Sequence, residues 1–111
     1  MSKTVTCPVE RWKGEVVLSD PLTMPQMAAW EEAVGAAVMA QEVGGRSYSW
    51  IFRTLPGILA VVEEWNLDNF PKRPTVANFP TKPIEDVNKL VGWLLGEISP
   101  LFVDATTVPN A

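Results

Sequence analysis

Residues Trp50–Trp65, with the sequence WIFRTLPGILAVVEEW, form the most apolar stretch of the chain. Its apolar residues recur at steps of four, three, four and three, the spacing of one helix face packed against other helices: Ile51, Leu55, Ile58, Val62 and Trp65. Other apolar residues widen this face: Trp50, Phe52, Leu59 and Val61. We therefore expect the core here, with cover on more than one side.

Pro56 lies in the middle of this stretch. We predict a continuous or nearly continuous helix from about Tyr48 to Asn66 with a bend at the proline, which has no backbone N–H to donate. The alternative is a second helix that begins at Pro56, because Gly57 follows it and proline is well tolerated in a first turn. Both alternatives keep the apolar face helical.

The residues before this stretch predict one strand pair and one helix. Residues 12–18 alternate between two faces, with Trp12, Gly14, Val16 and Leu18 on one side, which predicts a strand paired with Lys3–Cys7 through a turn near Pro8. Thr23 and Gln26 form a capping-box signature, so a helix should run from about Met24 to Glu42 and stop at Gly44–Gly45. We expect its inner side to hold Met27, Trp30, Val34, Ala37 and Val38.

The helix predicted over Met24–Glu42 is rich in small residues. Alanine is a good helix former, which is one sufficient explanation. The other explanation is a close contact with a neighbouring helix or subunit, because small side chains let two backbones approach. The residues concerned are Ala28, Ala29, Ala33, Gly35, Ala36, Ala37 and Ala40.

A proline-rich connector and a last helix follow. Leu67–Pro83 contains four prolines, which excludes a helix, and three apolar residues should anchor it: Phe70, Val76 and Phe79. The last helix should open with Thr81 or Lys82 ahead of Pro83 and carry Glu85 and Asp86 in its first turn, where carboxylates suit the helix dipole. Its apolar face holds Ile84, Val87, Val91, Leu94 and Ile98, a period that makes it the expected partner of the Trp50–Trp65 helix.

These elements predict a mainly α fold. We expect one domain over residues 1–111: an extended segment at 1–22 with a short strand or hairpin, a three-helix core at 23–103 with the connector before the last helix, and a loose tail at 104–111. Pro100 should end or kink the last helix. No stretch is apolar enough for a signal peptide or a membrane span, so we expect a cytoplasmic protein.

Composition argues against several classes of function. The net charge of −4 opposes binding to nucleic acid and to anionic lipid. The chain has no histidine and one cysteine, so His-dependent nucleophile systems and cysteine zinc sites are excluded. Cys7 is expected to be a small buried or half-buried apolar residue.

Three carboxylate pairs are expected to be solvated: Glu31–Glu32, Glu63–Glu64 and Glu85–Asp86. We expect no enzymatic activity, cofactor or metal.

Two features remain as binding candidates. Five tryptophans are many for 111 residues, and Trp12, Trp30 and Trp93 are either core residues or the aromatic anchors of an interface. Gly92 and Gly96 have the spacing of a close helix contact, or match it by accident.

Three segments resemble the tail assembly chaperones of long-tailed bacteriophages: WKGEVVLSDPLTMPQMAAWEEA at 12–33, LPGILAVVEEWNLDNFP at 55–71 and FPTKPIEDVNKLVGWLLGEISPLF at 79–102. The similarity lies in the general pattern and brings no catalytic motif. It implies a mainly helical fold that binds the tape-measure protein, keeps it soluble and assists tail tube assembly in the cytoplasm of the infected bacterium. Self-association is an open alternative.

We predict that the partner, a tape-measure or tail tube protein, binds at a surface made by Ala29, Ala33, Ala36, Trp30, Trp50, Phe52 and Trp93. The alanine face would receive a partner helix, and the aromatic residues would anchor it. Two other classes of function are weighed beside the chaperone. A structural protein of the tail or head-tail connector is the first, and an enzyme with a closed polar pocket is the second.

Overall fold

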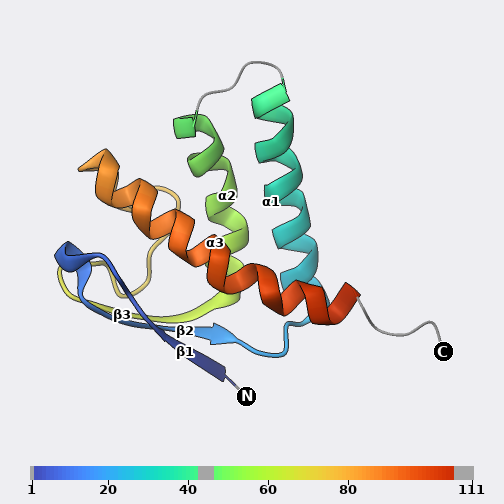
Figure 1. Ribbon diagram of the computed structural model, residues 1–111, viewed down its shortest axis with the longest axis horizontal. Coiled ribbons are helices and arrows are strands. Elements are labelled where there is room, and N and C mark those ends of the chain that lie inside the picture. Colours follow the sequence, from blue (N-terminus) through green and yellow to red (C-terminus); the bar gives the residue numbers. More distant parts are fainter. Residues whose placement is uncertain (1, 43–46, 107–111) are drawn as a thin grey trace.

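The computed structural model describes residues 2–42 and 47–106, with side chains for residues 2–39 and 49–101. It contains three helices and a three-stranded antiparallel sheet, and the helices predominate (Figure 1). The elements in order are β1 (Ser2–Thr6), a 3-10 turn (Glu10–Trp12), β2 (Gly14–Ser19), α1 (Met24–Glu42), α2 (Ser47–Val61), β3 (Val62–Leu67) and α3 (Ile84–Thr106). None of the helices in the described residues is long and apolar enough to cross a membrane.

The N-terminal hairpin forms as predicted. β1 and β2 pair antiparallel, with Val5 opposite Val16, and the turn between them holds Pro8 and the short 3-10 helix. Trp12 lies in that 3-10 turn rather than in the strand, and its side chain is buried beside those of Val16 and Leu18 in the core. The period-two alternation of the sequence therefore located the strand and its inner face correctly.

The largest difference from prediction is β3. The segment from Val62 to Leu67 is a strand paired antiparallel with β2, so the predicted helix to Asn66 is wrong beyond Val61, and the sheet order is β1-β2-β3. The register shifts between Val17 and Leu18, which places one extra residue in β3. This β-bulge puts Glu63 and Glu64 both in solvent and both Val62 and Trp65 in the core. The buried residues Val62 and Trp65 are therefore three positions apart, a spacing that is also typical of one face of a helix.

Helix α2 continues through Pro56, so the continuous helix was correctly preferred over a break at the proline. Its most extensive contact with another helix is with α1, whereas α3 was the predicted partner (Figure 1). The reason is a close approach at Gly57. A Cβ atom on this residue would lie 3.0 Å from the Cβ of Ala33 and 3.0 Å from the Cα of Trp30. One of the small residues of α1, Ala33, therefore serves a close contact within the fold.

Helix α1 has the predicted bounds and the predicted cap. The backbone N–H of Thr23 donates to Oε1 of Gln26 over 2.8 Å, and the N–H of Gln26 faces Oγ1 of Thr23 at 3.4 Å. Trp30 and Ala37 are buried as expected, but Val38 is 44% exposed and was wrongly placed on the inner side. The predicted stop at Gly44–Gly45 lies outside the described residues.

Helix α3 runs diagonally across the α1–α2 hairpin in Figure 1, and its buried side chains join the common core: Val87, Leu90, Val91, Leu94 and Ile98. Ile84, predicted on the same face, is 40% exposed. The helix passes Pro100 and reaches Thr106, so residues 104–106 are helical rather than a loose tail; residues 107–111 lie outside the described part. Ion pairs tie this helix to the hairpin region, between Arg11 and Asp86 (2.8 Å) and between Lys3 and Glu97 (3.8 Å).

The connector is anchored as predicted. Phe70 and Phe79 are buried and Val76 is half-buried. Phe70 stacks on Trp65 at 5.2 Å between ring centroids and meets Trp12 edge-on at 5.6 Å. Phe79 meets Trp65 edge-on at 5.9 Å. These four rings join the sheet, the 3-10 turn and the connector, so β3 is held by aromatic packing as well as by its strand pairing.

Replacing Gly57 with leucine should lower the free energy of unfolding by about 1–3 kcal/mol, the usual cost of overfilling a packed contact. The side chain would press on the backbone of Trp30, which cannot move without shifting α1. Urea denaturation followed by circular dichroism measures the change. Gly35→Leu is the matched control, because no atom lies within 4 Å of a Cβ at Gly35, and we expect no loss of stability there. Equal losses in the two variants would contradict the close approach at Gly57.

Candidate protein-binding groove

An open groove lies between α1 and α2, with a volume of about 490 Å³. Helix α1 contributes four residues to its wall, α2 contributes four, and the connector contributes Val76. The lining residues are Ala29, Glu32, Ala33, Ala36, Ser49, Phe52, Arg53, Pro56 and Val76. We call this surface the α1–α2 groove. Ala36 lies seven positions after Ala29, so the groove extends about 10 Å along α1, or about two helical turns.

The groove is open because of the residue types on its two walls. The alanines give α1 a thin wall, whereas Phe52 stands up from α2 with 56% of its surface exposed. A smaller hollow of about 100 Å³ continues on the other side of Phe52 and shares Val76 with the groove. Its remaining wall comes from α2, the connector and α3, and it includes the exposed Ile84. The exposed Phe52 thus contributes to the walls of both hollows.

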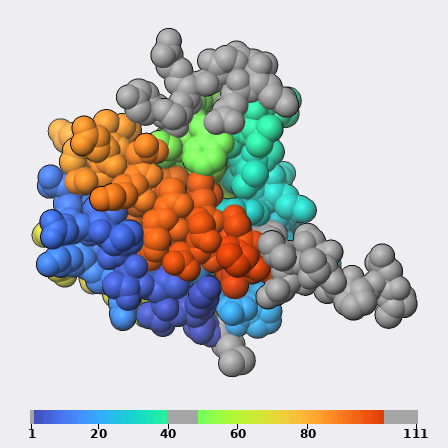
Figure 2. All heavy atoms as spheres, viewed as in Figure 1, coloured from blue at the N-terminus to red at the C-terminus, as the bar shows by residue number. Residues whose placement is uncertain are grey.

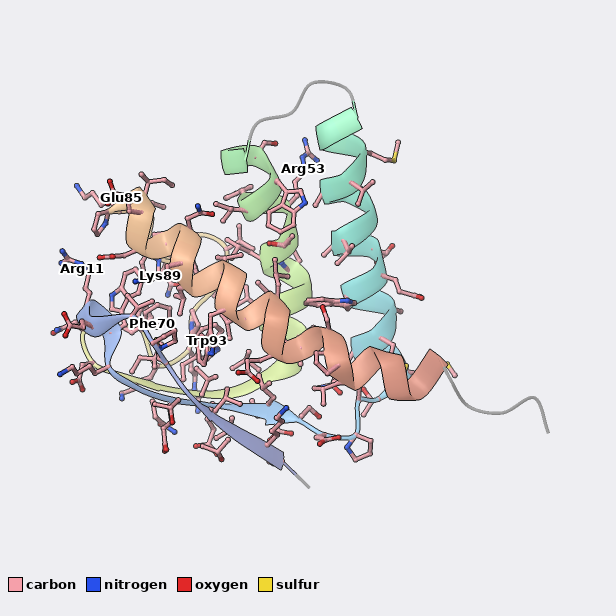
Figure 3. The ribbon with its side chains drawn as sticks, viewed as in Figure 1. Arg11, Arg53, Phe70, Glu85, Lys89 and Trp93 are labelled. Atoms are coloured by element: carbon pink, nitrogen blue, oxygen red, sulfur yellow. The ribbon has the colours of Figure 1, made fainter. Side chains whose placement is uncertain are left out.

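Two opposite charges border the groove. Glu32 lies on the α1 wall and is exposed, and Arg53 lies on the α2 wall, between the upper turns of the two helices in Figure 3. The Nε of Arg53 donates to Oγ of Ser49 over 3.4 Å, and within the described residues neither charge forms an ion pair. An apolar segment with a charged edge can therefore be recognised here by hydrophobic contact and by charge.

The residues predicted as a binding surface divide among three places. Ala29, Ala33, Ala36 and Phe52 meet in the α1–α2 groove, although Ala33 is buried at its floor. Trp30 and Trp50 instead line a separate hollow of about 380 Å³, together with Leu95 and Gly96 of α3. Trp93 is partly buried on α3 and lies away from the groove in Figure 3.

Several groove residues were missed from the sequence: Glu32, Ser49, Arg53, Pro56 and Val76. Their positions depend on the packing of α2 against α1 and on the path of the connector. One signal was available, because Ser49, Phe52, Arg53 and Pro56 recur at steps of three, one and three and so share one face of a helix. The neighbouring face of the same helix has the stronger apolar pattern, and the prediction was based on that face.

The other candidate features have structural roles or face solvent. Glu31 and Glu32 are exposed, and so are Glu63 and Glu64, although the latter pair lies on a strand. A Cβ placed on Gly92 or Gly96 would have no atom within 4 Å, so no described helix approaches this pair closely. The described residues hold no group of three or more potential metal ligands among His, Cys, Asp and Glu, and no buried side-chain polar atom there is unsatisfied.

Cys7 is buried at 7% exposure, as predicted. Burial raises the pKa of its thiol, and a backbone hydrogen bond with Val9 partly opposes this shift. A raised pKa leaves little thiolate at neutral pH, and the thiolate is the reactive form. Cys7 therefore belongs to the core and offers no nucleophile.

Comparisons of the chain with models of known protein families, with curated proteins and with solved structures found no match.

Proposed function

We propose that the protein is a tail assembly chaperone of a long-tailed bacteriophage, and that the α1–α2 groove binds a helical segment of the tape-measure protein. The observation that carries this proposal is the apolar groove around the exposed Phe52. The segment resemblance supplies the identity of the partner. A tape-measure chain is long and largely helical, so its apolar faces need cover before the tail is assembled.

The size of the groove determines what it can hold. About two turns of a helix fit along the Ala29–Ala36 wall, enough for anchors at positions i, i+3 or i+4, and i+7 of the partner. Such a contact is small compared with a standard protein interface. Modest affinity suits a chaperone, because the tape-measure chain must leave it when tube subunits assemble.

Phe52→Asp should weaken binding to the tape-measure protein by about thirtyfold, because it removes the central apolar anchor, and hot-spot residues contribute about 2 kcal/mol or more. Ala36→Glu should weaken binding similarly, because a long charged side chain at this position would occupy the groove and block the partner helix. The measurement is co-purification after co-expression, followed by titration of the purified proteins. Ala33 is unsuitable for this test, since it is buried against Gly57 and a charge there would disturb the fold.

Asn88→Asp is the matched control, because Asn88 is exposed on α3 and the change adds the same negative charge. This variant should bind like the original protein. Circular dichroism and thermal unfolding should show that all three variants remain folded. Unchanged binding of folded Phe52→Asp and Ala36→Glu would contradict the proposal for the groove.

The alternative assignment, a structural protein of the tail or head-tail connector, predicts a different location. A chaperone leaves the assembled tail, so mass spectrometry of purified virions should not detect the protein, whereas tube and tape-measure peptides should be abundant. Detection in virions at a stoichiometry comparable to that of a tail component would support the structural role instead.

A further inference from the structure

Helix α1 carries a second row of residues on the side that points away from α2. Met24, Ala28, Glu31, Gly35 and Val38 recur at steps of four, three, four and three, and all five are exposed. We call this row the outer seam. Its spacing is that of the contact positions of a coiled coil. Met24 is 82% exposed, Val38 is 44% exposed, and the neighbouring Met39 is 66% exposed.

This exposure is unusual for a helix on the outside of a small domain. A surface helix normally has one apolar face toward the core and one polar face toward water. Helix α1 buries Trp30, Ala33 and Ala37 yet presents large apolar side chains on its outer seam as well. The two large apolar residues of the seam, Met24 and Val38, lie at its two ends, about 21 Å apart along the helix. In Figures 1 and 2 α1 lies at an edge of the molecule, where this side is accessible.

The shape of the outer seam suits a second helix. Ala28 and Gly35 are small and lie between the larger Met24 and Val38. No atom lies within 4 Å of a Cβ built at Gly35, so the fold itself makes no use of the missing side chain. A helix that crosses α1 at Gly35 can therefore approach closely, with its own larger residues seated between Met24 and Val38.

The charge of Glu31 determines which kind of helix can bind the outer seam. Glu31 stands in the middle of the outer seam and forms no ion pair with any described residue. A helix that covers Met24 and Val38 would remove this carboxylate from water, which is costly unless a cation pairs with it. Helix α1 has three glutamates, at 31, 32 and 42, and no lysine or arginine. A second α1 therefore brings no cation, and the net charge of −4 opposes contact with an anionic bilayer.

We propose that the outer seam binds an amphipathic α-helix of another protein whose apolar seam carries one arginine or lysine opposite Glu31. This site is separate from the α1–α2 groove, since Ala29, Ala33 and Ala36 lie on a different face of α1. The proposal does not depend on the chaperone assignment, and it describes the partner by its chemistry alone.

Two synthetic helical peptides of three heptads test the proposal. Both have leucine at the seam positions and glutamine elsewhere; one has a single arginine at the central seam position and the other has glutamate there. Fluorescence anisotropy with the full-length protein should show saturable binding of the arginine peptide. The glutamate peptide should bind at least about tenfold more weakly, because it places two carboxylates together.

Variants of the protein locate the contact. Glu31→Arg should reverse the preference, so that the glutamate peptide becomes the tighter ligand. Gly35→Gln should reduce binding of the arginine peptide at least about tenfold by blocking the close approach, without lowering the melting temperature. Gly92→Gln is the matched control, because Gly92 is an exposed helical glycine with equally open surroundings on α3. It should bind the arginine peptide normally.

Several results would overturn the proposal. One is the absence of binding by the arginine peptide, and another is equal affinity for both peptides with no reversal in Glu31→Arg. Sedimentation equilibrium that shows self-association abolished by Gly35→Gln would assign the outer seam to a second copy of the chain. Binding to phosphatidylcholine–phosphatidylserine vesicles that Gly35→Gln abolishes would assign it to a membrane surface.

Discussion

Replacement of Trp65 by alanine should lower the free energy of unfolding by about 3–5 kcal/mol, the usual cost of removing a large buried aromatic side chain. Trp65 is 4% exposed and lies on β3 between Phe70, which stacks on it, and Phe79, which meets it edge-on. Its removal leaves a cavity and breaks the aromatic packing that holds the connector to the sheet. Since domains of this size are stable by only about 5–15 kcal/mol, the variant should be near its folding limit.

Urea denaturation followed by far-ultraviolet circular dichroism measures this loss without depending on tryptophan fluorescence. Trp93→Ala is the matched control, because Trp93 is only partly buried on α3 and takes no part in the ring contacts of Trp65. We expect Trp93→Ala to cost about half as much or less, in proportion to the smaller apolar area removed from the core. Equal losses in the two variants would contradict the central position of Trp65.

Gly14→Ala should cost about 3 kcal/mol, a large effect for the addition of one methyl group. Gly14 has a φ of +141°, a backbone conformation that L-residues with a side chain rarely adopt. A Cβ on Gly14 would also overlap the carbonyl oxygen of Asn66 and lie 3.1 Å from the Cα of Leu67. Because both obstacles are backbone atoms of β3, the new methyl group can be accommodated only if β2 and β3 separate.

The same denaturation measurement applies to Gly14→Ala, and Gly96→Ala serves as its control. Gly96 is exposed on α3 with no atom within 4 Å of a Cβ, so alanine there should leave stability unchanged or raise it slightly through its helix propensity. A cost below about 1 kcal/mol for Gly14→Ala would mean that β2 and β3 do not pair as described. Amide hydrogen exchange should show the greatest loss of protection at Val16 and Trp65, which face each other across this pair.

Local patterns in the sequence predicted an element correctly where its structure does not depend on a distant segment of the chain. The alternation around Val16 located β2, and the Thr23–Gln26 cap located the start of α1. The pattern failed at Val62–Leu67, because the bulge in β3 gives buried positions the spacing of a helix. Only the pairing with β2 distinguishes the two structures, and pairing between distant segments is not visible in local periodicity.

The candidate groove was predictable only in part, for a similar reason. Of the two explanations for the alanine pattern, a close helix contact holds at Ala33, and Phe52, which was named among the predicted binding residues, is exposed. The sequence could not show that Gly57 directs α2 against Ala33, which assigns part of the alanine face to the fold and leaves Ala29 and Ala36 at the groove. Arg53 and Val76 depend on that packing and on the connector.

The most direct test of the proposed groove is site-specific photo-crosslinking. p-Benzoylphenylalanine would replace Phe52 in one variant and Asn88 on α3 in a second, and each would be co-expressed with the tape-measure protein and irradiated. The groove proposal predicts a crosslink to the tape-measure chain from position 52 and none from position 88. A crosslink from position 88 alone, or a stable complex without any crosslink from position 52, would contradict the assignment of the α1–α2 groove as the binding site.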